Sequence, residues 1–311
     1  LVNFKRYQIG KVYRKDDPQI NKGRYCEFLQ GDFDIIGTDY GSMIQDVEIL
    51  SLTDNILREI LGNNTFEIRI NNWKLLYDVI TFCNGNNYFN TLCSSLDKLD
   101  KISWVEIKKE LNDVKKIDQS IINKLDSYVD MVIKFFNSEQ KNNQLFLLDL
   151  YKKNYISEET YNEINKLFEN LKQVKDIDEN IIFDPLLARG LDYYTGSIFE
   201  VTYIDKSLLP SSIVAGGRYD NMLEKLGNQG KIPAIGVSFG IERLVTIIES
   251  QNKLESNTFK NDIKVFVATV GKNIEIHKLN LVMEFRKNNI KVDFLYNQNP
   301  KMRQQFDYVF N

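Results

Sequence analysis

The sequence predicts an α+β protein in which strand-rich segments enclose an all-helical insertion. Apolar and polar residues alternate within residues 1–43 and again within residues 181–250, as they do in half-buried strands. Residues 94–180 contain neither glycine nor proline and repeat their apolar residues with the period of a helix. Residues 262–311 read as strand, helix and strand, followed by a short helix and a last strand, which is the opening of a small α/β unit.

Composition narrows the class of protein. A chain of 311 residues exceeds one comfortable core, so two domains or a domain with an insertion are expected. The net charge of −3 means that any nucleic acid would bind a local basic patch. Cys26, Cys83 and Cys93 form no CxxC pair and His277 is the single histidine, which argues against disulfide frameworks and zinc sites. We therefore expect a cytoplasmic protein without a metal site of its own and, lacking an apolar run of roughly 20 residues, without a membrane span.

The first strand-rich segment divides into elements in a clear order. Two strands joined by the polar loop KDDPQINKG occupy residues 1–43. A helix is predicted from Ile44 to Leu61, because its apolar spacing is helical and Gly62 can end it. The alternation of Phe66, Ile68 and Ile70 predicts a strand, and NWKLLYDVITF predicts a second helix.

The later elements follow the same logic. Ser103 and Ser157 precede acidic residues and predict helix starts within the insertion. Strands are predicted at Ile181–Phe183 and Ser197–Val201, which we read as two sides of a hairpin, and a helix at 241–250. We therefore divide the chain into one split domain, residues 1–93 and 181–250, and an insertion, residues 94–180. Residues 251–261 form a linker. Residues 262–311 form a partial α/β domain with FDYVF as its last strand.

Arginines are the candidates for holding a phosphate. No GxGxxG follows a strand, and GNQGKI has neither the spacing nor the Ser/Thr of a P-loop. An arginine fork donates parallel hydrogen bonds and keeps its charge. The strand-associated candidates are Arg14, Arg24, Arg189, Arg218 and Arg243. An arginine chosen at random is more often a surface ion-pair partner, and that reading stands beside the functional one.

Four segments in order resemble the histidyl-tRNA synthetase family of class II, of the eukaryotic type. KVYRKDDPQINKGRYCEFLQGDFDIIG looks like motif 2 and IPAIGVSFGIERL like motif 3, while LARGLDYYTG and AGGRYD look like the two histidine-specific signatures. The resemblance implies an antiparallel sheet flanked by helices, with a helical insertion and the start of an anticodon-binding domain. It also implies activation of L-histidine with ATP and Mg²⁺, transfer to the tRNA for histidine, and a homodimer.

The resemblance assigns the ATP-binding residues. Arg14 and Arg189 would approach the α-phosphate from opposite sides and are the predicted catalytic residues. Arg243 would hold the γ-phosphate, Phe28 would stack under adenine, and Asp16 would lie near its exocyclic amine. Arg24 would also bind ATP. Cys26 stands where the family commonly has a second arginine in this loop.

The resemblance also assigns the histidine pocket. Asp34 would accept a hydrogen bond from one imidazole N–H, and the phenol of Tyr194 or Tyr193 would meet the other nitrogen. Neighbours in a strand point to opposite faces, so only one tyrosine of the pair should touch the ring unless a bulge occurs at Gly190 or Gly196. Gln30 would face the amino or carboxylate end beside Arg189, and Tyr219 would close the pocket.

Two other readings remain. A synthetase-like regulatory module would keep the fold and lose catalytic residues, against which Arg14, Arg189 and Arg243 argue. A structural or tRNA-binding piece of the family is the second, because motif 1 and most of the anticodon-binding domain are not found in these residues. That reading predicts poor charging by this stretch alone and aggregation through an unpaired strand at Phe306–Phe310.

Overall fold

A seven-stranded sheet forms the centre of the protein. The computed structural model describes residues 4–15, 26–37, 41–100, 102–138, 142–174, 177, 180–190, 193–227, 231–255, 263–271, 274–297 and 300–310. The sheet order is β1-β2-β7-β6-β5-β3-β4, and all neighbours are antiparallel except β3 and β4. The strands are β1 Phe4–Tyr13, β2 Glu27–Ile36, β3 Phe66–Asn72, β4 Ile181–Phe183, β5 Ser197–Tyr203, β6 Val214–Arg218 and β7 Ala234–Gly240.

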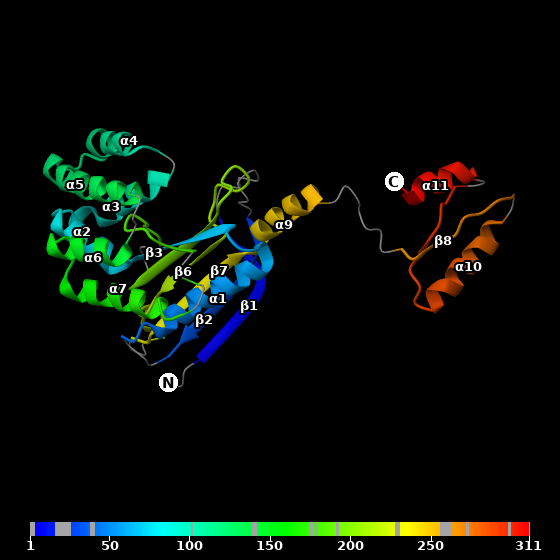
Figure 1. Cartoon of the computed structure of the whole chain (residues 1–311), viewed down its shortest axis with the longest axis horizontal. Coiled ribbons are helices and arrows are strands. Elements are labelled where there is room, and N and C mark those ends of the chain that lie inside the picture. The colour runs from blue at the N-terminus through cyan, green and yellow to red at the C-terminus, as the bar shows by residue number, and fades with distance from the viewer. Residues whose placement is uncertain are drawn as a thin grey trace. The chain divides into compact units, whose positions relative to one another are not determined.

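The helices surround this sheet with their apolar sides inward. The α-helices of this region are α1 Ile44–Leu61, α2 Trp73–Phe82, α3 Phe89–Leu96, α4 Trp104–Lys109, α5 Gln119–Phe136, α6 Asn143–Lys152, α7 Glu158–Leu171, α8 Met222–Gly227 and α9 Ile241–Glu255. Helix α1 contacts β7 and α7. Helices α2 to α7 gather on the side of the sheet where β3 lies, at the opposite edge from β1 (Figure 1).

Several predicted elements are confirmed residue by residue. Helix α1 begins at Ile44 and ends at Leu61, and Gly62 follows it with φ 88°, a conformation that suits glycine. Ser103 caps α4 with a full capping box, in which its hydroxyl accepts from the Glu106 backbone N–H and the Glu106 carboxylate accepts from the Ser103 backbone N–H. Ser157 caps α7 in the same way through its hydroxyl. Helix α9 continues to Glu255, into the residues predicted to be a linker.

The predicted hairpin around residues 184–196 is wrong. Strands β4 and β5 are not neighbours, because β3 lies between them and pairs with both. The chain between β4 and β5 therefore passes from one side of β3 to the other, and its described residues, 184–190 and 193–196, form neither helix nor strand. This crossing carries Arg189, Tyr193 and Tyr194 past the end of β3, and it is the feature of the fold that most affects the site.

The helical insertion and the sheet share one hydrophobic core. Tyr128 on α5, Phe66 on β3, Phe183 on β4 and Phe199 on β5 are among the largest fully buried side chains and belong to the same cluster. By spatial clustering, residues Leu1–Ile248 form one compact unit and Glu249–Asn311 form another. The finer division at residues 94 and 181 stays a prediction.

The second unit is a small α/β arrangement. Strands β8 Val265–Phe266 and β9 Val292–Asp293 pair in parallel, with helix α10 Glu275–Lys287 between them in sequence. His277 is exposed on α10, as expected. The last predicted strand is wrong, because FDYVF belongs to helix α11 Met302–Phe310. The expectation of aggregation through an unpaired strand there loses its structural basis. No helix within the described ranges is long and apolar enough to cross a bilayer.

Candidate active site

The register of the strands gathers polar side chains on one face of the sheet. Residues that oppose one another on successive strands share a face, because side chains alternate along each strand. One such row crosses five strands and consists of Asp32, Ser238, Ala215, Glu200 and Arg69. A second row, two residues along, begins with Arg6, Asp34, Gly236 and Gly217. The small residues in the middle of both rows leave space above the sheet.

A cavity of about 260 Å³ occupies this space. Its volume is below the range of about 300–1,000 Å³ that is typical of pockets for drug-sized molecules, so it suits a small ligand. Its lining residues are Asp34, Tyr193, Tyr194, Ala215, Tyr219, Met222, Gly236, Val237 and Ser238. The four residues predicted to surround the imidazole therefore meet in one cavity, although they come from β2, the crossing segment and the residue after β6.

Asp34 has a partner for each carboxylate oxygen. The Tyr219 hydroxyl donates a hydrogen bond to Oδ1, and the Nε of Arg6 on the neighbouring strand lies 3.3 Å from Oδ2. Burial, and then the hydrogen bond to Asp34, raise the pKa of Tyr219 well above that of an exposed tyrosine. The phenol therefore keeps its proton at neutral pH and acts as a fixed donor to Asp34.

Gly236 makes room for this pair. It stands directly opposite Asp34 in the β2–β7 register. A Cβ at position 236 would overlap Asp34 Oδ1 and would lie 3.1 Å from the Tyr219 hydroxyl. Any side chain there would displace the carboxylate from its present position, so glycine is required by the closeness of the two groups.

Tyr193 and Tyr194 both line the cavity, which corrects the expectation of alternate faces. They do not lie in a strand. The backbone N–H groups of both residues donate to the Gly190 carbonyl oxygen, at 3.1 Å and 3.0 Å, and Gly190 has φ 56°. This turn brings the two rings to 4.2 Å between centroids, with a tilt of 47°. Burial raises the pKa of Tyr194, so this phenol also stays protonated.

A second polar group lies along β2 beside the cavity. The Arg14 guanidinium lies over the Phe28 ring at 5.1 Å from its centroid, and its Nη2 donates to Gln30 Oε1 at 3.2 Å. Gln30 Nε2 donates in turn to Asp32 Oδ1 at 2.6 Å. The structure thus brings together the predicted residues Arg14, Phe28 and Gln30. One face of the Phe28 ring is covered by Arg14.

The predicted phosphate-binding residues Arg189 and Arg243 converge on one serine. Arg189 Nη2 donates to the Ser212 hydroxyl at 2.8 Å, and Arg243 Nη1 donates to the Ser212 carbonyl oxygen. Arg189 is also ion-paired with Glu200. Among the described residues that line the cavity, neither arginine occurs. The predicted ATP ligands Asp16 and Arg24 lie outside the described residues.

Arg218 has a structural position. Its side chain is buried and forms an ion pair with Asp46 of α1, and its Nη1 lies 3.3 Å from Asp220. The first of the two histidine-type signatures thus contributes cavity residues, while the arginine of the second fixes α1 to the sheet.

Sequence reasoning missed Arg6, Gly236, Ser238, Met222 and Glu200. Gly236 and Ser238 lie within the quoted segment IPAIGVSFGIERL, and their alternation with Ile235 and Val237 could have placed them on the polar face. Arg6 opposes Asp34 through the β1–β2 register, which the sequence does not fix. The position of Glu200 depends on strands that are far apart in sequence.

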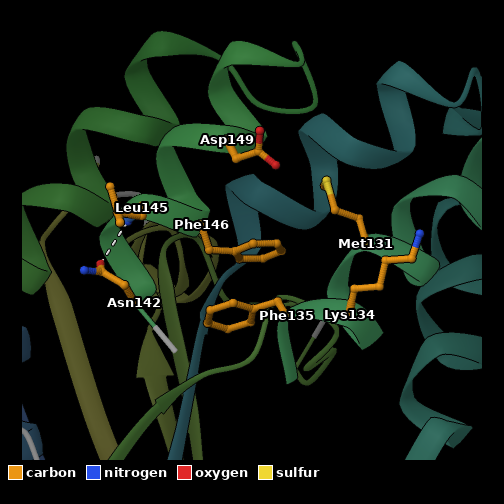
Figure 2. Close-up of a pocket in the computed structure, with 7 residues that line it drawn as sticks. All are labelled: Met131, Lys134, Phe135, Asn142, Leu145, Phe146 and Asp149. Carbon is orange, nitrogen blue, oxygen red and sulfur yellow. Dashed lines mark hydrogen bonds between the residues drawn. The ribbon is translucent and has the colours of Figure 1, made fainter. Parts of the chain in front are cut away.

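A different cavity lies between helices α5 and α6 (Figure 2). It has a volume of about 370 Å³, and the stacked rings of Phe135 and Phe146 form its floor at 4.2 Å between centroids. None of the predicted site residues lines it. Its wall is apolar apart from Lys134, Asn142 and Asp149.

The antiparallel sheet, with its cavity over β2, β6 and β7, defines the catalytic fold of a class II aminoacyl-tRNA synthetase. A solved histidyl-tRNA synthetase from Nostoc sp. PCC 7120 has the same fold, with a TM-score of 0.69 and 24% identity, covering 98% of this chain and 68% of that one. The family model described as histidyl-tRNA synthetase matches residues 4–244. The chain belongs to the histidyl-tRNA synthetase family.

Curated relatives agree with this assignment. The cytoplasmic histidine–tRNA ligase of Dictyostelium discoideum is 37% identical over 309 residues, which is 99% of this chain. The mitochondrial histidine–tRNA ligase of Bos taurus is 35% identical over 322 residues and covers all of it. The chain spans 63% and 62% of the lengths of these two relatives.

Proposed function

We propose that the protein is a histidine–tRNA ligase. In the first step an oxygen of the histidine carboxylate attacks the α-phosphorus of ATP, the bond to the bridging oxygen breaks, and pyrophosphate leaves. In the second step the ribose hydroxyl at the 3′ end of the tRNA attacks the histidyl carbonyl, and AMP leaves. The observation that carries the proposal is the cavity in which Asp34 and three tyrosines surround a small space in a member of this family.

The cavity supplies polar partners at fixed positions for an imidazole. Asp34 accepts from one ring N–H, and the Tyr194 phenol meets the other nitrogen. Tyr219 holds Asp34 and closes the pocket, Tyr193 covers Tyr194, and Gln30 faces the amino or carboxylate end. A side chain without matching groups would leave these buried polar groups unpaired, which is the strongest means that a pocket has to reject it.

The arginines supply fixed positive charge for the phosphates. Arg14 and Arg189 bind the α-phosphate from opposite sides, where negative charge builds during attack, and Arg243 binds the γ-phosphate. Phe28 stacks under adenine, next to the Arg14 guanidinium that lies over its ring. Asp16 reaches the exocyclic amine of the base, and Arg24 contributes to the same ATP site.

Mg²⁺ enters the proposal with ATP. When bound with ATP it would supply positive charge to the phosphates and help pyrophosphate to leave. Within the described ranges no group of three or more His, Cys, Asp or Glu residues could hold a metal ion.

The wider setting of the protein is part of the proposal. Its macromolecular partners are the tRNA for histidine and a second copy of the chain in a homodimer. A cytoplasmic location stays a prediction, because relatives named for the cytoplasm and for mitochondria match at similar identity, 37% and 35%.

Amino-acid-dependent exchange between pyrophosphate and ATP tests the proposal on the full-length protein. Each of the standard amino acids is supplied in turn, and we expect exchange with histidine alone. A catalytically inactive regulatory or tRNA-binding module would bind histidine without exchange, and that result would contradict the proposal. Exchange with a different amino acid would contradict the assignment of the pocket.

A further inference from the structure

A buried series of alternating charges ends at Arg189. Arg69 on β3 is ion-paired with Asp184, and its Nη1 lies 3.3 Å from Glu200 Oε1 on β5. Glu200 in turn is ion-paired through Oε2 with the Nε of Arg189. The side chains of Asp184 and Glu200 are 1% and 5% exposed. Both anions are thus removed from water, and Glu200 stands between the cations Arg69 and Arg189.

Glu200 is an unexpected residue at its place in the sheet. On β5 the residues that share its face are Ile198 and Thr202, and both are buried, as Glu200 itself is. A carboxylate in such surroundings is costly and adds little net stability even when it is paired, compared with an apolar side chain of similar volume. Its presence therefore points to a purpose other than stability.

The position of Glu200 connects it with the cavity. It belongs to the row that runs through Asp32, Ser238 and Ala215, and Ala215 separates it from Ser238. Ala215 and Ser238 line the cavity. From this place Glu200 reaches the one predicted catalytic arginine that comes from the irregular crossing segment.

The crossing segment itself is held at several points before Arg189. The Asp184 backbone N–H donates to the Ile70 carbonyl oxygen at 2.8 Å, Tyr128 donates to that of Pro185 at 3.0 Å, and Asn71 donates to that of Leu187 at 2.9 Å. The backbone is thereby fixed, but the long side chain of Arg189 still needs its own restraint. Glu200 and the Ser212 hydroxyl provide it from two directions.

Arg69 decides how strongly Glu200 offsets the charge of Arg189. A carboxylate paired with Arg189 alone would cancel much of the field that the guanidinium offers to an anion. Because Glu200 shares its charge with Arg69, and Asp184 holds Arg69 from the other side, Arg189 is oriented while it still attracts a phosphate.

We propose that Glu200 is a positioning residue that orients Arg189 toward the reacting α-phosphate, with Arg69 and Asp184 holding Glu200 in place. The inference rests on the proposed function, since it needs Arg189 to act on ATP. It goes beyond that function in assigning a purpose to a buried ion-pair series that touches no substrate.

Pyrophosphate exchange with Glu200→Gln in the full-length protein tests the inference. Loss of the restraint should lower kcat by about 10- to 100-fold, the effect of a misplaced catalytic group, while the KM values for histidine and ATP stay within about threefold. Glu110→Gln is the matched control, because it removes a carboxylate paired with Lys98 and Lys115 in the helical insertion. Its kcat should equal that of the wild type. A changed KM with an unchanged kcat would overturn the inference. An equal fall in kcat in the Glu110→Gln control would also overturn it.

A double-mutant cycle separates positioning from a general structural role. If Glu200 acts through Arg189, Arg189→Lys with Glu200→Gln should be no slower than Arg189→Lys alone, because the target of the restraint is already gone. Multiplicative losses would overturn the inference. Should Glu200→Gln fail to fold, Glu200→Asp keeps the charge on a shorter side chain. A folded Asp variant that is slow, and whose loss disappears when it is combined with Arg189→Lys, supports the inference. An Asp variant with the wild-type kcat, or with a loss that multiplies with that of Arg189→Lys, overturns it.

The same assay keeps the two proposals apart. Absence of histidine-dependent exchange in the wild type would remove the proposed function and the inference with it. Exchange in the wild type that Glu200→Gln leaves intact would remove the inference alone.

Discussion

At the scale of single residues, the site depends on one carboxylate and the groups that hold it. Asp34 receives the Tyr219 hydroxyl on one oxygen and faces Arg6 on the other. Each carboxylate oxygen has two lone-pair directions, so a ligand N–H can be added without breaking either contact. Because the Tyr219 hydroxyl donates to Asp34 and Arg6 is ion-paired with it, its orientation is set before any ligand arrives, which favours binding without a reorganisation cost.

Gly236→Ala should damage histidine binding although it adds only a methyl group. The new Cβ would overlap Asp34 Oδ1, and the carboxylate would have to move. We expect the KM for histidine to rise and kcat/KM to fall by about tenfold or more, since small displacements of a binding group have effects of that size. Gly10→Ala is the matched control on β1, where a Cβ would meet the Gln8 amide nitrogen at an ordinary 3.5 Å. Equal kinetics for Gly236→Ala and the wild type would show that Asp34 need not stay where it is.

Substitutions in the tyrosine pair should have smaller effects on kcat/KM than those at Asp34. Tyr194→Phe removes one neutral hydrogen bond of about 0.5–1.5 kcal/mol, so kcat/KM for histidine should fall roughly 2- to 12-fold. Tyr193→Phe is the comparison, because its ring is more exposed and lies tilted against that of Tyr194. It should have the smaller effect. The reverse order would assign the contact with the ring to Tyr193.

The sequence could predict the site residues that lie within short recognisable segments, but not the partners that reach them from other strands. Asp34, Tyr193, Tyr194 and Tyr219 lie in recognisable segments, and they do meet in one cavity. The partners that hold them were out of reach, because they depend on cross-strand register. Arg6 opposes Asp34 across a loop, and Ser212 joins two arginines from unrelated segments.

At the scale of elements, local sequence signals predicted the ends of helices correctly, but they did not predict which strands pair. Caps at Ser103 and Ser157 and the end of α1 at Gly62 were predictable, since capping is decided within a few residues. The pairing of β4 and β5 with β3 joins residues from three separate segments. No pattern within residues 181–201 reveals that a strand from residues 66–72 lies between them.

The error at FDYVF has a simpler cause. Five residues cannot separate a period of 2 from one of 3.6. The preceding residues decide the matter, because Gln305 is buried in α11 and exchanges hydrogen bonds with the backbone of Thr269. An element that spans Met302–Phe310 is long enough to be a helix, whereas the quoted pentapeptide alone was not.

Ser103→Ala should destabilise the helical insertion. The substitution removes the hydroxyl that accepts from the Glu106 backbone N–H at the start of α4, and the loss of such a cap typically costs about 1 kcal/mol of unfolding free energy. Chemical denaturation measures the change. Ser127→Ala, on the exposed side of α5, should stay within about 0.5 kcal/mol of the wild type. Equal stability of the two variants would show that α4 does not depend on this cap.

At the scale of the whole molecule, the buried thiols predict how stability varies with pH. Burial raises the pKa of Cys83 from 9.0 to about 11 and that of Cys93 from 9.0 to about 12. The folded chain therefore keeps these protons where the unfolded chain loses them. The stability that the two thiols contribute is fully present below pH 9 and is lost as pH rises toward 11 and 12.

Cys83→Ala and Cys93→Ala isolate this contribution. Each thiol should add about 1.4 kcal/mol per pH unit to the fall in unfolding free energy above pH 9, and each variant should fall less steeply than the wild type. Urea denaturation at pH 8 to 10.5 under reducing conditions provides the measurement. Parallel pH curves for wild type and variants would mean that the thiols are solvated in the folded protein.

The function of the whole molecule is the choice of one amino acid, and the claim that Asp34 makes this choice is tested by Asp34→Asn. Pyrophosphate exchange is measured with histidine and ATP varied separately. The amide keeps the size of the carboxylate but removes its charge and can present a donor where an acceptor is needed. We predict a loss of about 10- to 100-fold in kcat/KM for histidine, a much smaller change in the KM for ATP, and weaker discrimination against other amino acids. A changed KM for ATP with unchanged kinetics for histidine would show that Asp34 does not recognise the imidazole.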